Sequence, residues 1–548
     1  MTEWGLSEHT RSLVYDLNEG YGFRDILKPE KWLSVVNQIA QSGEPAAVAG
    51  LLIWRKLAPT LMSAIVETVD HLVCQVASED LRSYSKWLRH QWGDYAFMYT
   101  GAYRLVPKDL HRFDKVADEP VPCFWGALSM HPNGYVRESA LSRLAKSTIG
   151  QEVPFLLLRT VDWVPQVRNK AIATIKERIT PKYARCFAEN LLLLTPLQKS
   201  DYRESVALVG SIEDLLLQEP TSQVLLEQID SAPRRTRRMA FSFAIRGDEK
   251  IRRQAIDRAR HTVDPVLRTR AIETAPHVVA ADELQNVLAE ARHDPHRLVR
   301  NRALHAYVDM LPDKADPPLR QALFDTSATN RQLARFYLKR RGENDFHSLY
   351  RQALGAKDVQ THRAGLRGLT DIGQKSDVED IRAFLKSGSS KTRRIALQAL
   401  VRLDPSGHIE HFYTALSDPI ASYSSVAALA LRKVGPNLEA ERLLKTFKGN
   451  DQPHTGINIL RAARGLPTWK RLYFYLCSLG YADRAEKEYI HQALANWCAH
   501  SSRLFTAPDS ALAESIGDAF LEGSRFLAEP LRVRLRDVLS QKKLQIDP

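Results

Sequence analysis

The stretch from Ser231 to Leu304 reads SAPRRTRRMAFSFAIRGDEKIRRQAIDRARHTVDPVLRTRAIETAPHVVAADELQNVLAEARHDPHRLVRNRAL. A short phrase begins three times within it, as RTRRMAFSFA at 235, VLRTRAIETA at 266 and LVRNRALHAY at 298. In each copy a basic residue is followed three positions later by alanine and then by further apolar residues. A phrase that returns at a steady interval is typical of a repeat architecture, so this stretch decides the fold.

The phrase continues on both sides of this stretch. Clear copies are YVRESALSRL at 135, QVRNKAIATI at 166, TNRQLARFYL at 329, QTHRAGLRGL at 360 and KTRRIALQAL at 391, and weaker ones are SDYRESVALV at 200 and SYSSVAALAL at 422. From Arg237 to Arg393 the basic position returns every 31 or 32 residues. Another apolar segment with helical spacing lies between copies, as at 281–291. The unit is therefore a helical hairpin, and such hairpins must stack into an all-α solenoid to bury their apolar faces.

The turns before several copies resemble those of HEAT repeats. Asp294-Pro295 leads to Arg300, and Asp162 leads to Arg168, in a pattern close to D-P-x-x-V-R. The resemblance covers about residues 124–435. It implies that the second helix of each hairpin lines a concave face, and that the repeated basic residue bonds an acidic residue of the neighbouring hairpin. Asp162, Asp294 and Asp358 are the matching acids that we expect.

The regions outside the clearest repeats predict helical caps at both ends. We expect an N-terminal helical cap domain at 1–122, a HEAT-like array at 123–435, and C-terminal helical repeats or a cap at 436–548. Seven of the nine tryptophans lie at or before position 163, so the N-terminal region packs larger side chains than the middle does. That region either caps the stack or forms a separate recognition domain, and the sequence leaves both alternatives open.

The composition points to an anionic partner and a cytoplasmic location. The net charge is +13, and 52 of the 77 basic residues are arginine, whose planar fork suits carboxylate and phosphate. Nucleic acid, an acidic protein and an anionic membrane surface all fit this balance. The five cysteines form no CxxC pair and predict reduced thiols. No apolar run reaches the ~20 residues of a membrane span, so we expect a soluble protein.

A helical wheel assigns different roles to neighbouring arginines. The repeated basic position lies only about 35° from the core direction, which predicts that it sits half-buried at the seam between hairpins. The position three residues later is small in nearly every copy, which predicts close helix approach. Its residues are Ala140, Ala171, Val206, Ala240, Ala271, Ala303, Ala334, Gly365, Ala396 and Ala427.

Arginines displaced from the repeated position point to solvent on the same wheel. These are the predicted partner-binding residues: Arg235, Arg238, Arg270, Arg302, Arg363 and Arg394. Residues 231–270 contain twelve basic residues against four acidic ones, and no matching acidic series falls on the same wheel positions. We interpret these arginines as a binding stripe. The alternative is a solvated face that only maintains solubility.

The sequence contains none of the common catalytic motifs, which predicts a protein that is not an enzyme and needs no cofactor. The pairs His293/His296 and His408/His411 have no third metal ligand in sight and are expected to be exposed histidines. One enzymatic alternative remains. Some HEAT-like DNA glycosylases that act on alkylated bases use tryptophans and an acid on a basic concave face. Asp162, Trp163 and Trp125 resemble such a set, without that family's full motif.

These observations predict a non-catalytic scaffold or adaptor that binds an acidic protein along a basic concave surface. Binding of duplex DNA is the alternative, because a row of arginines over several hairpins is comparable in length to one or two duplex turns of ~34 Å. Aromatic residues are scarce in the middle repeats, which argues against the base stacking that single-strand binders use.

Overall fold

The computed structural model describes residues 4–20, 29–52, 57–93, 104–116, 121–387, 389–450, 452–501, 506–542 and 544. Over these residues all regular elements are helices, and no strand occurs, which confirms the all-α fold class. The helices form successive hairpins that stack into an α-solenoid. The chain divides into two compact units, Met1–Leu311 and Pro312–Pro548.

Unit 1 begins with a less regular set of helices. They are α1 (Glu8–Gly20), α2 (Glu30–Ser42), α3 (Val48–Leu51), α4 (Pro59–Cys74) and α5 (Leu81–Gly93). α2 packs on α4, and α4 packs on α6 (Pro122–Leu128), so these helices continue directly into the repeats. The domain boundaries that we expect after residues 122 and 435 remain predictions.

The repeats of unit 1 follow as helical hairpins. The first helices are α6, α8 (Val153–Arg159), α10 (Ala184–Glu189) with α11 (Leu194–Gln198), α13 (Ser222–Ser231), α15 (Glu249–His261) and α17 (Ala281–Ala291). The second helices carry the repeated phrase and are α7 (Gly134–Leu144), α9 (Pro165–Arg178), α12 (Arg203–Leu216), α14 (Arg234–Ala244), α16 (Pro265–Thr274) and α18 (Arg297–Met310).

Unit 2 consists of seven further hairpins within the described residues. The first helices are α19 (Asp316–Ala322), α21 (Phe346–Leu354), α23 (Val378–Arg382), α25 (Ile409–Leu416), α27 (Ala440–Lys448), α29 (Thr468–Ser478) and α31 (Ser510–Gly523). The second helices are α20 (Ala328–Arg340), α22 (Val359–Ile372), α24 (Ser390–Leu403), α26 (Ala421–Val434), α28 (Thr455–Ala462), α30 (Arg484–Ala499) and α32 (Glu529–Gln541).

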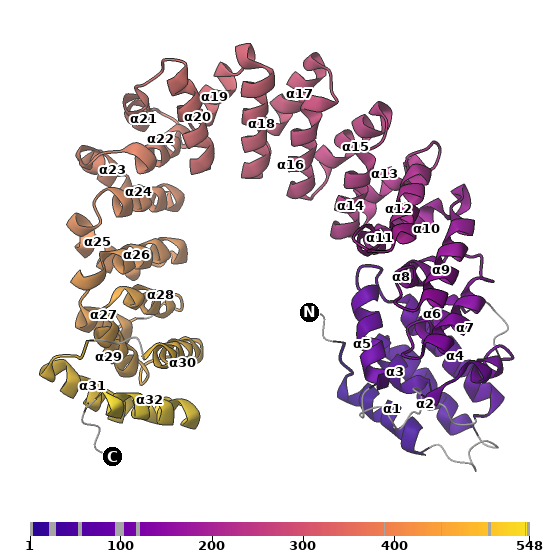
Figure 1. The fold of residues 1–548 in the computed structure, drawn as a ribbon. Coiled ribbons are helices and arrows are strands. Elements are labelled where there is room, and N and C mark those ends of the chain that lie inside the picture. The colour runs from indigo at the N-terminus through magenta and orange to yellow at the C-terminus, as the bar shows by residue number, and fades with distance from the viewer. Residues whose placement is uncertain are drawn as a thin grey trace. The chain divides into compact units, whose positions relative to one another are not determined.

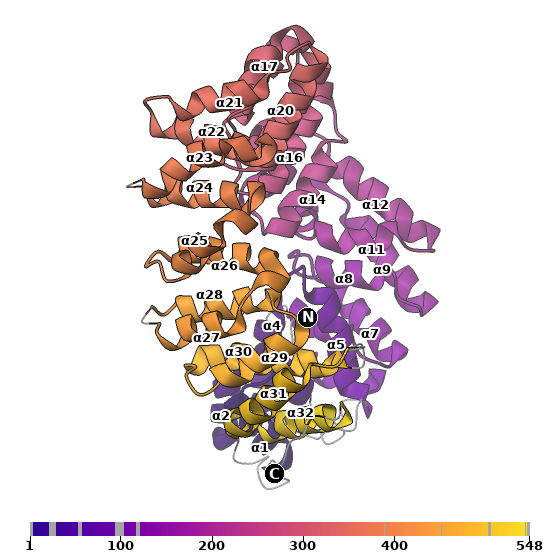
Figure 2. The same ribbon diagram turned by 90° about the vertical axis from the view of Figure 1, so that its left-hand side faces the viewer.

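The second helices of unit 2 stack on one another and form one side of the unit. α22 packs on α24, α24 on α26, and α26 on α28. In Figure 1 these helices lie to the right of their partners α21, α23, α25 and α27. Figure 2 shows the unit from the side of the first helices, in chain order from α21 to α27. The exposed residues of these second helices therefore lie on one common surface of unit 2.

The small position of the repeated phrase is where helices approach most closely. The residues at this position are buried in every copy except α12, as the spacing predicts. A Cβ added at Gly365 would lie 2.8 Å from the carbonyl oxygen of Tyr350, so only glycine fits between α22 and α21 there. In α12 the predicted alignment of the weak copy at 200 with the other copies of the phrase is wrong by one residue. Val206 is 40% exposed, and Ser205 is fully buried, with its Oγ donating to the carbonyl of Thr160 at 2.7 Å.

The prediction that all cysteines are reduced is wrong. Cys74 at the end of α4 and Cys123 at the start of α6 form a disulfide, with their Cα atoms 5.6 Å apart. The two residues are 49 positions apart in the chain, and only the packing of α4 on α6 brings them together. Cys186, Cys477 and Cys498 are free. Because disulfides are rare in a reducing cytoplasm, the predicted cytoplasmic location loses the support that it took from the cysteines.

None of the described helices is both long and apolar enough to span a membrane.

Candidate partner-binding surface

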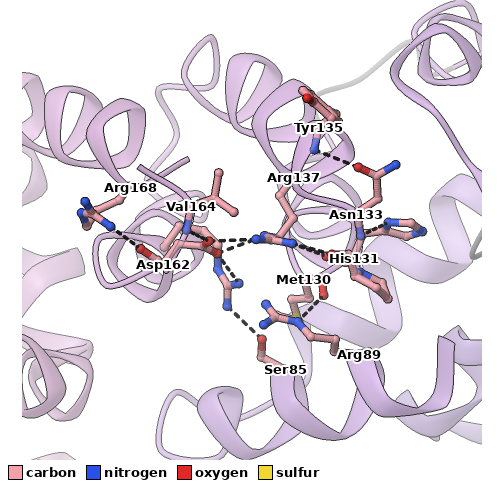
Figure 3. A network of polar contacts seen from close by, with 12 residues as sticks. Ser85, Arg89, Met130, His131, Asn133, Tyr135, Arg137, Asp162, Val164 and Arg168 are labelled. Carbon is pink, nitrogen blue, oxygen red and sulfur yellow. Dashed lines mark hydrogen bonds and ion pairs between the residues drawn. The ribbon is translucent and has the colours of Figure 1, made fainter. Parts of the chain in front are cut away.

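The repeated basic residue joins successive hairpins. Arg137 on α7 donates from Nη1 to the carbonyls of His131 and Pro132, at 3.0 and 2.7 Å, in the turn of its own hairpin. Its Nε and Nη2 donate to the two carboxylate oxygens of Asp162 in the next turn, at 3.0 and 2.8 Å (Figure 3). The Arg137 side chain is fully buried, which makes this a dry, bidentate ion pair.

The same geometry recurs along the chain. Arg268 binds the carbonyl of Thr262 at 2.8 Å and both oxygens of Asp294 at 2.7 and 3.0 Å. Arg393 pairs with Asp418 at 3.4 Å. These contacts confirm the predicted seam role for Arg137, Arg268 and Arg393, with Asp162 and Asp294 among their partners. The prediction is wrong for Arg203 on α12, which is exposed. The fold is a HEAT-like α-solenoid.

The acids of this ladder also start the second helices. Asp162 accepts a hydrogen bond from the backbone of Val164, and Asp294 accepts one from His296, at 3.0 and 2.6 Å. These bonds satisfy amide groups that a helix start leaves without partners. The prediction for Asp358 is wrong. Among the described residues that carboxylate accepts hydrogen bonds only from its own helix start, and Arg331 pairs instead with Asp371 on α22.

The expected roles of Arg237 and Arg238 are exchanged in α14. Arg238 makes the bidentate pair with Asp264 of the next hairpin, at 2.6 and 2.8 Å, and its side chain is 28% exposed. Arg237 donates to the carbonyl of Ala232 at 3.1 Å. The hydrogen bond from Arg238 holds the pKa of the Asp264 carboxyl below its ordinary value, against the opposing effect of burial. Arg238 is thus a seam residue and not an exposed one.

Arg363 shows the same departure from the wheel. Its Nε and Nη2 donate to Thr392 and to the Oγ of Ser389, at 3.0 and 2.7 Å, at the start of α24. The wheel places this position in solvent because it considers one core direction only. In a solenoid the next hairpin covers a second side of each helix, and the residue after the repeated position faces that hairpin.

Arg235, Arg270 and Arg302 are exposed, as predicted. Arg302 pairs with Glu273 of the preceding second helix at 2.6 Å, so an acid does occur on this side. Arg270 donates to the Oγ of Ser242 at 3.2 Å. The role of these three residues in partner binding remains a prediction.

Much of the arginine density around residues 249–261 is neutralised between hairpins. On α15, Arg253 pairs with Glu283, Arg258 with Asp230, and Arg260 with Glu290. All three arginines belong to a first helix, on the side away from the repeated phrase. The local excess of basic residues therefore does not by itself mark a binding surface.

Unit 2 contains a basic cavity between its second helices. Its volume is about 570 Å³, and the lining residues come mainly from α24, α26, α28 and the turn after α28. Four are arginines, namely Arg394, Arg432, Arg461 and Arg464, and none is acidic. Leu429 contributes an apolar side chain that is 49% exposed. Of the six predicted residues, only Arg394 lies in this cavity.

These arginines differ from the seam arginines in lacking carboxylate partners. Within the described residues, Arg432 and Arg464 have no side-chain hydrogen bond or ion pair, and Arg461 reaches only the side chain of Asn458, at 3.3 Å. The Nε of Arg394 is buried and has no hydrogen-bond partner among those residues. Unpaired guanidinium groups side by side create a positive potential for an anionic ligand.

The series of neighbouring arginines extends from α22 to α29. Burial lowers the pKa of Arg367 on α22, and the charges of Arg331, Arg363 and Arg394 lower it further. At the other end a second cavity of about 490 Å³ shares Arg464 and Tyr489 with the first. Arg471, Asn496 and His500 line this second cavity, again with no acidic residue. We refer to the two cavities, with Arg394, Arg432, Arg461, Arg464 and Arg471, as the arginine groove.

Four arginines of the groove, namely Arg432, Arg461, Arg464 and Arg471, are not among the predicted residues. Arg432 directly follows the last and weak copy of the phrase at 422–431, and no later copy provides a position on which to align the other three. A different signal is present in the chain. Residues 419–438 and 452–482 contain no aspartate or glutamate at all. In a chain with 64 acidic residues, two segments that contain basic but no acidic residues indicate a positively charged surface.

The other candidate sites take up different roles. His408 contacts the carbonyl of Asp404, and His411 contacts the hydroxyl of Tyr423 at 3.1 Å, so these two histidines are partly buried and not exposed as expected. Asp162, considered above as the acid of a glycosylase, is buried and bonded to two arginines. A carboxylate held in this way is not available to a substrate, so the structure does not favour the glycosylase alternative.

No family model and no curated protein matches the chain. The condensin Cnd3–Cnd2 subcomplex of S. pombe resembles it with 12% identity over 99% of this chain and 96% of that chain, at a TM-score of 0.25. Importin beta is 12% identical over 98% of this chain and 87% of that chain, with a TM-score of 0.24. The karyopherin Kap121p, bound to the SUMO protease Ulp1p, is 11% identical over 97% of this chain and 58% of that chain, with a TM-score of 0.22. TM-scores this low do not relate the chain to any one of these proteins.

Proposed function

We propose that the chain is a non-catalytic scaffold whose arginine groove binds an acidic segment of a partner protein. The observation that carries the proposal is the contrast between two sets of arginines. Those at the seams are bonded to aspartates, whereas those in the groove face cavities that no acidic residue lines. A ligand with carboxylates would supply the missing partners through charge-assisted hydrogen bonds.

The cavities favour a polypeptide over a duplex. Leu429 and Val426 line the first cavity among the arginines, and Tyr489 lies where the two cavities meet. Apolar and aromatic surface inside a basic groove suits an acidic segment that also carries apolar side chains. A duplex backbone offers phosphates and sugars, and its binding needs only cations on an open surface.

Duplex DNA is the second candidate. The observation that favours it is a succession of arginines that line cavities without acidic residues, over four consecutive hairpins from Arg394 on α24 to Arg471 on α29. In unit 1, Arg235, Arg270 and Arg302 add exposed cations on second helices, and we propose them as further contacts for either partner.

A binding experiment separates the two candidates. The probes are a fluorescent peptide of alternating glutamate and leucine and a short DNA duplex, each followed by anisotropy over a range of salt concentrations. We expect the peptide to bind, and the double variant Arg432→Glu/Arg464→Glu to abolish its binding. Arg382→Glu is the control for a charge reversal outside the groove, because Arg382 is an exposed arginine of unit 2 on a first helix, α23.

Tighter binding of the duplex would replace the protein-binding proposal. In that case each removed arginine should reduce the log–log slope of affinity against salt by about one. Absence of binding by both probes to the wild-type protein, or equal loss in the control variant, would contradict the groove as a binding site.

A further inference from the structure

A second cluster of arginines, in unit 1, surrounds a single carboxylate. Besides Arg137, Asp162 is bonded to Arg159 on α8, whose Nη1 lies 3.2 Å from Oδ2. Arg89 on α5 approaches from the other side and donates from Nε to the carbonyl of Met130 at 3.3 Å. Figure 3 shows the Arg137 side chain bonded to Asp162 in the turn before α9, and the Arg89 side chain bonded to the carbonyl of Met130 close by.

The charges of this cluster do not balance. Asp162 uses both of its oxygens for Arg137, Arg159 and the backbone of Val164. It is also the one described carboxylate whose charge acts on both Arg89 and Arg159. Within the part of the chain that the structure describes, three guanidinium groups therefore accompany one carboxylate. A buried excess of like charge is costly unless another group compensates it.

The titration behaviour is consistent with this excess. Burial lowers the pKa of Arg159 to about 9, and the nearby charge of Arg89 contributes to the decrease. Burial also lowers the pKa of Arg89, with a further decrease caused by Arg137. Asp162 opposes both shifts without cancelling them.

Donor groups in the cluster are left without acceptors. The Arg159 side chain is 6% exposed, and its Nε has no hydrogen-bond partner within the described part of the chain. The terminal nitrogens of Arg89 likewise make no hydrogen bond to any described residue. Unlike Arg159, Arg89 is only half-buried, so a ligand can reach it.

The surroundings of Arg89 form an accessible basic surface. The Trp163 ring is 57% exposed, and its centroid lies 4.3 Å from the guanidinium carbon of Arg89 and 4.4 Å from that of Arg137. On α5, Arg82 and Lys86 are exposed, and the helix contains no acidic residue. The spacing of four and three residues puts Arg82, Lys86 and Arg89 along one side of the helix.

We propose that this cluster is a binding site for a phosphate dianion, supplied as free phosphate or as the phosphomonoester of a partner. The excess of two positive charges matches one dianion. The planar fork of Arg89 suits its oxygens, and the exposed ring of Trp163 lies beside the point of entry. The site lies in unit 1, apart from the arginine groove, and does not depend on the function proposed for that groove.

The test uses the full chain with inorganic phosphate, O-phosphoserine and acetate as probes. Thermal unfolding and isothermal titration are measured for the wild-type protein, for Arg89→Gln, and for Arg185→Gln as the control, because Arg185 is an exposed arginine of α10 that pairs with Glu227 outside this cluster. Phosphate should raise the unfolding midpoint of the wild type and of Arg185→Gln. In Arg89→Gln the affinity for phosphate should fall at least about tenfold, in line with the loss of charged hydrogen bonds.

The two sources are separated by the phosphoserine arm. Binding of phosphoserine at least as tightly as phosphate assigns the site to a phosphorylated partner, and weaker binding assigns it to the free anion. Without phosphate, Arg89→Gln should be no less stable than the wild type, because it removes an uncompensated charge. A lower midpoint for this variant together with an unchanged response to phosphate, or equal stabilisation by acetate, would overturn the proposal. Far-UV circular dichroism confirms that the variant is folded.

Discussion

At the scale of the residue, the neighbours of an arginine decide what it does. Arg137 is buried and bidentate to Asp162, and Arg302 pairs with Glu273 at the surface, whereas Arg432 faces a cavity and has no side-chain partner among the described residues. The period of the repeat identifies buried seam arginines such as Arg137, because a seam recurs with every hairpin. The period cannot separate a surface-paired arginine from a cavity-lining one, because this difference depends on the residues of adjacent hairpins.

The seam arginines should contribute far more to stability than the exposed ones. We expect Arg137→Met to lower the free energy of unfolding by about 3 kcal/mol, because it breaks a buried pair while Asp162 retains Arg159. Arg302→Met should cost less than about 1 kcal/mol, as surface ion pairs do. Urea unfolding of both variants measures the difference. Equal losses would show that the ladder does not hold the hairpins together.

The pair of Arg238 and Asp264 should make stability depend on pH. The pKa of Asp264 is lowered in the folded state, mainly by the hydrogen bond from Arg238. A carboxyl of this kind stabilises the fold above its unfolded pKa of about 3.9, and the stabilisation disappears as pH falls through the folded pKa. Asp264→Asn keeps the helix start, because asparagine also accepts from the backbone.

Unfolding curves between neutral and acidic pH test this contribution. The wild type should exceed Asp264→Asn in stability by a constant amount above about pH 5, and the gap should narrow below about pH 4. Arg238→Gln should remove the same pH dependence. A gap that persists unchanged at acidic pH would mean that the pair makes no electrostatic contribution.

At the scale of the element, the sequence predicts the closest helix contacts, which are made at the small position of the phrase. It does not predict the contacts that a second helix makes with the following hairpin. The row of small residues predicts close approach correctly, and the position occupied by Gly365 is the tightest example. The alignment fails in α12, where Ser205 replaces the usual alanine and bonds Thr160. It fails again at Arg238 and Arg363, because a wheel does not represent the following hairpin. The disulfide between Cys74 and Cys123 could not be predicted from the sequence either, because it depends on how α4 packs on α6.

Two glycines inside second helices should respond in opposite ways to alanine. A Cβ at Gly365 would clash with the backbone of Tyr350, so Gly365→Ala should destabilise the protein by about 1–3 kcal/mol. A Cβ at Gly210 in α12 meets nothing within 4 Å, so Gly210→Ala should stabilise it by about 0.5–1 kcal/mol through helix propensity. Thermal or urea unfolding measures both changes. The same sign for the two variants would contradict the packing of α22 on α21.

At the scale of the whole molecule, the stacked hairpins provide both a scaffold and a surface. The ladder of arginines and aspartates lies at the seams, and it leaves the exposed positions of the second helices free to vary. In unit 2 those positions form the arginine groove, which the repeated phrase does not predict. The acid-free segments 419–438 and 452–482 are the sequence signal that we find for the groove, and the stacking of the hairpins is needed to bring these segments onto one surface.

The most direct test of the central claim is a quantitative co-purification from native lysate, carried out with and without nuclease treatment. Wild-type protein, Arg432→Glu/Arg464→Glu and the control Arg382→Glu are compared by mass spectrometry, with folding of each confirmed by thermal unfolding. We predict that one set of acidic proteins is retained by the wild type and by the control and is lost from the double variant. Retention of the same proteins by all three, or loss of the set on nuclease treatment alone, would contradict the claim.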